Sequence, residues 1–77
     1  MQNFPDVIKQ AANDWIEEKT RQLVGSNPPY GMATEENLRA ARRDVEREYP
    51  SVAAARDAGT LNATVLRVLL PKLEQIA

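Results

Sequence analysis

The chain has 77 residues, a formal net charge of −1 and no cysteine or histidine. This length predicts one domain, residues 1–77, with a small core, and the slightly acidic balance argues against binding nucleic acid by bulk charge. The absence of cysteine excludes disulfides and thiol chemistry. The absence of histidine removes the commonest metal ligand and the usual general base.

The N-terminal segment is expected to form a helix over residues 5–24. At about 100° per residue its apolar side chains fall on one face, and they are Ile8, Ala11, Ala12, Trp15, Ile16 and Leu23. Trp15 lies in the middle of that face, so we expect it to pack in the core rather than to bind a partner. On the outer side, Glu17 and Arg21 have the i,i+4 spacing of a favourable ion pair.

Residues 25–33, GSNPPYGMA, predict the main loop, because Asn-Pro-Pro favours extended backbone and Gly31 ends it. Tyr30 and Met32 are its large apolar side chains. We expect both to fold back over one end of the core. The alternative is a rigid, exposed recognition loop.

A second helix is expected over residues 35–49, with Thr34 as its N-cap and Pro50 as its stop. Its narrow apolar face consists of Leu38, Ala41, Val45 and Tyr49. A basic stripe runs beside that face at i,i+4 spacing and consists of Arg39, Arg43 and Arg47. We expect a solvated surface on which the pairs Glu35–Arg39 and Arg42–Glu46 offset the repulsion. The alternative is a contact for phosphates or for an acidic partner.

Residues 51–70 predict two helices joined by a glycine turn. Ser51 is expected to cap a helix over 52–58, and Gly59 to supply the left-handed residue that follows it. Thr60 is expected to cap a last helix over 61–76. Since Pro71 removes a backbone donor, we expect a kink or break just before it.

This pattern resembles the helix-turn-helix, in which a small residue precedes a glycine by four positions and branched apolar residues follow in the second helix. The matching residues are Ala55, Gly59, Val65 and Val68, and Thr64 and Arg67 are also typical of such second helices. An αα-hairpin with a glycine turn would show much of the same pattern, and it is the preferred interpretation.

If the last helix read DNA, its outward residues would be Leu61, Asn62, Ala63, Leu66, Arg67 and Leu70. Half of these are leucines, whereas base edges are read mainly by Arg, Lys, Asn, Gln and Ser or Thr. The leucines favour burial against another helix or a partner protein. The alternative hypothesis is a DNA-binding transcriptional regulator, and its contacts would be Thr60, Asn62, Ala63 and Arg67.

The last helix also has a wide apolar stripe, made of Leu61, Val65, Val68, Leu69, Leu73 and Ile76 and widened by Leu66 and Leu70. A surface helix normally buries a narrower face. Either this helix is central, with the other three around it, or part of it meets a second chain. A two-fold homodimer is the commonest such assembly, and we expect Leu66→Glu with Leu70→Glu to return it to monomer.

No catalytic or metal-binding motif occurs in the sequence. The hydroxyl side chains have no histidine to act as a base, and neither a calcium loop nor a glycine-rich phosphate loop is present. We therefore expect no enzymatic activity, no metal and no cofactor. No signal peptide is evident, and no window approaches the roughly 20 apolar residues that span a bilayer. A cytoplasmic protein without a membrane partner is expected.

The sequence predicts an all-α fold, a compact bundle of about four helices with a helix-turn-helix-like pair at 51–70. The predicted core is Ile8, Trp15, Ile16, Leu23, Leu38, Val45, Tyr49, Val65, Val68, Leu69 and Leu73. The preferred function is a protein-interaction module, such as a small regulator, inhibitor or assembly factor of bacterial or phage type. Its partner-binding residues would be Leu61, Leu66, Leu70, Arg39, Arg43 and Arg47.

Overall fold

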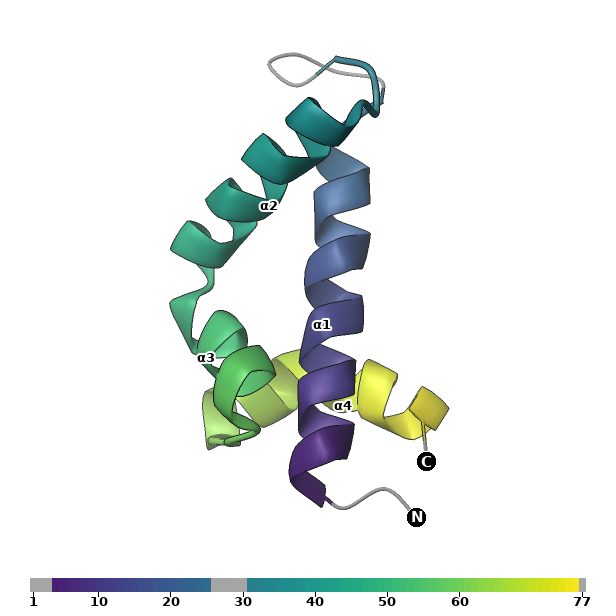
Figure 1. Cartoon of the computed structure of the whole chain (residues 1–77). Helices are drawn as coiled ribbons and strands as arrows, with labels where there is room; N and C mark the ends of the chain where they lie inside the picture. Colours follow the sequence, from purple (N-terminus) through teal and green to yellow (C-terminus); the bar gives the residue numbers. More distant parts are fainter. Residues whose placement is uncertain (1–3, 26–30, 77) are drawn as a thin grey trace.

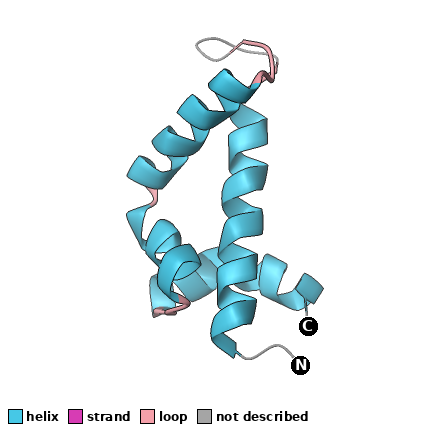
Figure 2. Cartoon of the chain, in the orientation of Figure 1, coloured by secondary structure: helices cyan, strands magenta, loops and turns pink. Residues whose placement is uncertain are grey.

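The computed structural model describes residues 4–25 and 31–76, and these residues form four α-helices and no strand. The helices are α1 (Phe4–Leu23), α2 (Glu35–Glu48), α3 (Pro50–Ala58) and α4 (Ala63–Ile76), as Figures 1 and 2 show. Each helix begins and ends within two residues of its expected bounds. The prediction of an all-α bundle of about four helices is confirmed.

The long helix α1 is the centre of the bundle. It contacts α2, α3 and α4, whereas no contact joins α2 to α4 within the described ranges. In Figure 1, α2 lies beside the C-terminal half of α1, and α3 and α4 lie towards its N-terminal end, where α4 crosses it. Ala11 and Ala12 are completely buried, and such small side chains let neighbouring helices approach α1 closely. The interpretation that the last helix is central is therefore wrong.

The core forms where α1 meets the other three helices. Its buried cluster is Ile8, Ala11, Ala12, Ile16, Val45, Val52, Ala55, Val65 and Leu69. Trp15 and Tyr49 pack against this cluster, and their rings meet edge to face with 4.9 Å between centroids, an arrangement that the ring quadrupoles favour. The Lys19 ammonium lies 5.5 Å from the centre of the Trp15 ring, within cation–π range. Trp15 thus packs on the core, as predicted.

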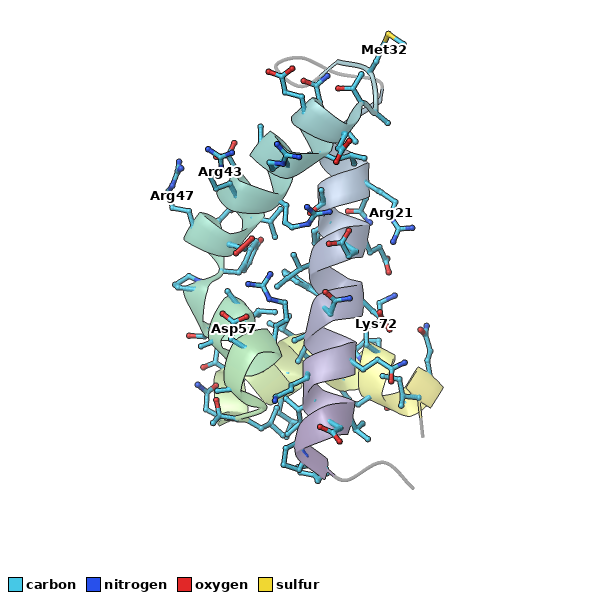
Figure 3. All side chains as sticks on the ribbon, viewed as in Figure 1. Arg21, Met32, Arg43, Arg47, Asp57 and Lys72 are labelled. Atoms are coloured by element: carbon cyan, nitrogen blue, oxygen red, sulfur yellow. The ribbon has the colours of Figure 1, made fainter. Side chains whose placement is uncertain are left out.

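The end of the bundle near the α1–α2 loop is less well covered than the sequence suggests. Leu23 is 39% exposed, and Leu38 is only half-buried, because α3 and α4 lie at the other end of α1 (Figure 1). Val24 is buried there instead. Met32 is 75% exposed and projects away from the helices (Figure 3), so the prediction that it covers the core is wrong. Tyr30 lies outside the described residues.

The starts of α2 and α3 confirm one predicted cap and correct another. The Thr34 hydroxyl accepts a hydrogen bond from the Asn37 N–H at 3.1 Å, as expected of an N-cap. Ser51, by contrast, lies inside α3, and Pro50 is the first helical residue. Proline suits this position because its fixed φ is already helical and its missing N–H would have no partner there.

The last helix begins later than expected and does not stop at its proline. The Asn62 Oδ1 accepts a hydrogen bond from the Val65 N–H at 2.8 Å, so Asn62, and not Thr60, caps α4. Asparagine is among the strongest N-cap residues. The helix then continues through Pro71 to its end at Ile76. The predicted break is therefore wrong, while a bend at this point stays a prediction.

Ion pairs join the helices through residues far apart in the sequence. The Arg42 guanidinium donates two hydrogen bonds to the Glu17 carboxylate, at 2.6 and 3.0 Å, and Arg56 donates to Glu46 at 3.0 Å. The local pairs expected for Glu17 with Arg21 and for Arg42 with Glu46 do not form close ion pairs, because packing brings each carboxylate to a guanidinium of another helix. The neighbouring charge still interacts favourably in both cases. Arg21 instead donates to the backbone carbonyl of Glu17.

The Glu17–Arg42 pair makes stability depend on pH. The hydrogen bond from Arg42 lowers the pKa of Glu17 below its ordinary value of 4.5. A carboxylate whose pKa is lowered on folding stabilises the fold fully at pH values above its ordinary pKa. This contribution to the free energy of unfolding is lost as the pH falls through the lower pKa of the folded state.

We expect Glu17→Gln to lower the free energy of unfolding by about 1 kcal/mol at neutral pH, since a two-pronged, partly buried pair lies at the upper end of the range for ion pairs near the surface. The difference from the parent protein should shrink to nothing in acid, as urea unfolding at a series of pH values would measure. Glu48→Gln, at an exposed carboxylate, is the matched control. A difference that persists unchanged in acid would contradict the assignment.

Candidate functional site

One face of α4 is left uncovered by the rest of the bundle. Val65 and Leu69 point into the core and are almost completely buried, whereas Leu66 is 41% and Leu70 46% exposed. The two exposed leucines are four residues apart, so they lie one turn apart on the same side of the helix. We call the exposed surface around them the α4 face, and it consists of Ala63, Leu66, Arg67, Leu70, Pro71 and Glu74.

Leu61 does not belong to this surface, although the sequence places it among the outward residues. It is half-buried and packs against the core cluster. Because α4 begins at Ala63, Leu61 lies in the turn and not on the helix. A helical position calculated for it is therefore wrong. Pro71 and Glu74, which the sequence reasoning missed, are exposed on α4, and Glu74 could have been found from its spacing of seven residues after Arg67.

The arginine stripe lies on a separate surface. Arg39, Arg43 and Arg47 are exposed on α2, and Arg43 and Arg47 project away from α1 in Figure 3. Arg39 pairs with Glu35, as predicted, and Arg47 pairs with Asp44, each at 3.3 Å. The stripe therefore carries mixed charge. Since α2 and α4 make no contact with each other within the described ranges, the residues predicted to bind a partner fall on two distinct surfaces.

The pair α3–α4 has the glycine turn that the sequence predicted. Gly59 has a left-handed φ of 70°, and its N–H donates to the Ala55 carbonyl at 2.8 Å. Ala55 and Val65 are buried on the inner side of the pair, and Val68 is half-buried. Both helices contact α1 and also each other. The pair thus consists of two helices joined by a glycine turn and packed on a central helix, an arrangement that both an αα-hairpin and a helix-turn-helix can have.

The residues of the DNA-binding hypothesis gather at the start of α4. Thr60, Asn62, Ala63 and Arg67 are all exposed. The amide oxygen of Asn62 is engaged in capping the helix, however, and Arg67 is the only one of these residues with a positive charge. The nearest basic residue along α4, Lys72, is paired with Glu18 of α1.

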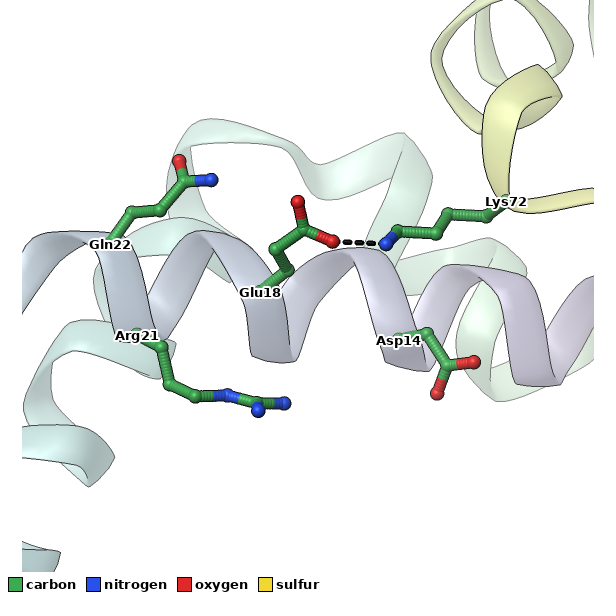
Figure 4. Close-up of a pocket in the computed structure, with 5 residues that line it drawn as sticks. All are labelled: Asp14, Glu18, Arg21, Gln22 and Lys72. Carbon is green, nitrogen blue, oxygen red and sulfur yellow. Dashed lines mark hydrogen bonds and ion pairs between the residues drawn. The ribbon is translucent and has the colours of Figure 1, made fainter. Parts of the chain in front are cut away.

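A polar hollow of about 470 Å³ lies where α1 passes the last turns of α4 (Figure 4). Its lining residues are Asp14, Glu18, Arg21, Gln22 and Lys72. The Lys72 ammonium donates to the Glu18 carboxylate, and this hydrogen bond lowers the pKa of Glu18. The two acidic and two basic groups balance, so the hollow has no preference for one sign of charge. The sequence could not predict the pair, whose members lie on different helices.

Comparison with known proteins found no relative of this chain. No protein-family model matches the chain, and neither a curated protein nor a solved structure is significantly similar to it. Across residues 4–25 and 31–76, no group of three or more acidic residues is arranged to hold a metal ion. Within the same ranges no helix combines the length and the apolar character needed to cross a bilayer.

Proposed function

We propose that this chain is a non-enzymatic protein-interaction module, such as a small regulator, inhibitor or assembly factor, and that it binds its partner through the α4 face. The observation that carries the proposal is the exposure of Leu66 and Leu70 side by side, in a bundle whose core is already formed around α1. Removing a leucine side chain fully from water is worth roughly 1.5–3 kcal/mol. Because Leu66 and Leu70 are 41% and 46% exposed, a little under half of that value is left for each of them on association.

The composition of the α4 face supports the same proposal. Its apolar residues, Leu66, Leu70 and Pro71, are flanked by one positive and one negative side chain, Arg67 and Glu74. An apolar centre with a polar rim is the usual anatomy of a protein–protein interface. The arginine stripe of α2 provides a second exposed surface, which would suit an acidic region of the same partner. Because Arg39 and Arg47 already have acidic neighbours, its contribution is expected to be smaller.

A DNA-binding regulator is the second candidate, and the glycine turn at Gly59 favours it. The helix after that turn would enter the major groove with Asn62 and Arg67 near the bases. Its exposed surface carries two leucines and a single arginine, however, whereas DNA binding draws mainly on several basic side chains. The protein-interaction proposal therefore has the stronger support.

Capture from cell lysate separates the two candidates. The tagged chain is expected to retain one or more proteins at defined stoichiometry, and nuclease treatment should leave them bound. Retention of nucleic acid, with every protein lost after nuclease treatment, would contradict the interaction proposal and support DNA binding. Raising the salt concentration gives a second readout, since DNA affinity falls steeply with salt while an apolar interface holds.

A further inference from the structure

We propose that the occupant of the α4 face is a second copy of this chain, which pairs with it antiparallel about a two-fold axis so that Arg67 of each copy meets Glu74 of the other. The inference deepens the proposed function and rests on it, because it uses the same surface. We choose a second copy over another protein because the positive and the negative charge of one α4 face can each meet the opposite charge of a second, antiparallel α4 face.

The spacing of the two charges sets the direction of pairing. Arg67 and Glu74 are seven residues apart, which is two helical turns, so they lie along one line of the helix surface. Their midpoint falls between Leu70 and Pro71. A two-fold axis through that midpoint, perpendicular to the helix, exchanges the two ends and places each arginine opposite a glutamate. Parallel pairing would instead place arginine against arginine, which is unfavourable.

Both charges are available for such a contact. Within residues 4–25 and 31–76, neither Arg67 nor Glu74 takes part in an ion pair, whereas Arg39, Arg42, Arg47, Arg56 and Lys72 all do. Both side chains belong to exposed residues. Antiparallel pairing would give each of them a partner of opposite charge, twice per dimer.

The apolar residues lie where this geometry needs them. Leu70 of each copy lies opposite Pro71 of the other across the axis, and the Leu66 side chains of the two copies extend the contact at its two ends. The bundle leaves room for the approach, since only α1 and α3 contact α4 within the described chain. One helix face buries less than the roughly 800 Å² per partner of a standard interface. The dimer is therefore weak, and its population depends on protein concentration.

Charge exchange tests the register directly, with the dimer dissociation constant measured by sedimentation over a range of concentrations at low salt. Arg67→Glu and Glu74→Arg, each studied alone, bring like charges together at two points and should weaken association by about tenfold or more. An equimolar mixture of the two variants should recover the parent affinity as a heterodimer, because both contacts are then complementary. The double variant Arg67→Glu/Glu74→Arg should recover it as a homodimer. Lys9→Glu, at an exposed cation of α1 outside both surfaces, is the matched control and should leave the dissociation constant unchanged.

A parent chain that stays monomeric at every concentration would overturn the inference. So would single variants that associate like the parent, or a mixture that recovers nothing while circular dichroism shows both variants folded. These results differ from a failure of the proposed function. If the parent is monomeric but retains nuclease-resistant proteins that Leu66→Glu/Leu70→Glu loses, the α4 face binds a different protein and only the self-pairing is wrong.

Discussion

Leu69→Ala is expected to lower the free energy of unfolding by roughly 2–5 kcal/mol, the usual cost of replacing a completely buried leucine and leaving a cavity. Leu69 is 0% exposed and belongs to the core cluster that joins α4 to α1. A domain of this size has a total stability of about 4–12 kcal/mol, so the variant would lose a large part of it. Thermal unfolding followed by circular dichroism should show a midpoint lowered by about 10 °C or more.

The next residue of the helix provides a matched control for this change. Leu70→Ala removes the same atoms from the same helix, but Leu70 is 46% exposed, so we expect a loss within about 0.5 kcal/mol. The contrast between adjacent leucines measures which side of α4 faces α1. Equal losses in the two variants, or a larger loss for Leu70→Ala, would mean that the face of α4 has been assigned wrongly and that the proposed interaction surface is core.

Gly59→Ala is the second change with a large expected effect, roughly 2–4 kcal/mol, because conformation and space both exclude a side chain there. The residue has a positive φ of 70°, and a Cβ built on it would lie 2.9 Å from the Pro5 carbonyl oxygen and 3.0 Å from the Pro5 Cβ. The first contact is with backbone, which cannot move aside without shifting the start of α1. Urea unfolding of parent and variant would measure the loss.

Gly31→Ala separates the two causes. Gly31 has a similar positive φ of 62°, but a Cβ there would meet nothing within 4 Å. Its replacement should therefore cost only the conformational part, about 1–2 kcal/mol. If the two glycine variants lost the same stability, the close approach of the glycine turn to the start of α1 would be refuted, and with it the docking of the α3–α4 pair on the central helix.

Much of this fold could be predicted from the sequence because the interactions that form a helix join residues only three or four positions apart. The apolar period identified all four segments to within two residues, and Thr34 gave the start of α2 correctly. Which helix is central could not be predicted in the same way. The stripe of α4 is wider, but the buried alanines of α1 allow close packing on several sides at once. That property depends on how the helices are assembled and not on the pattern of any one helix.

The local period of the last helix also predicted part of the candidate site. Leu66 and Leu70 were expected at the outer edge of the last helix, and both are exposed. Leu61 was assigned wrongly, because shifting the start of α4 by two residues moves it from the helix into the turn. The partner of Glu17 lies 25 residues away on another helix, and no local spacing could have indicated it.

Binding of another protein through the α4 face is tested most directly by lysate capture after nuclease treatment, comparing the parent chain with Leu66→Glu/Leu70→Glu. Leu23→Glu is the control, since it makes the same chemical change at a leucine of similar exposure on α1. The parent and Leu23→Glu should retain the same proteins, a second copy of the chain included. The double variant should lose them while keeping the parent's circular dichroism spectrum and unfolding curve. A folded double variant that retains every partner of the parent would contradict the assignment of this face as the binding surface.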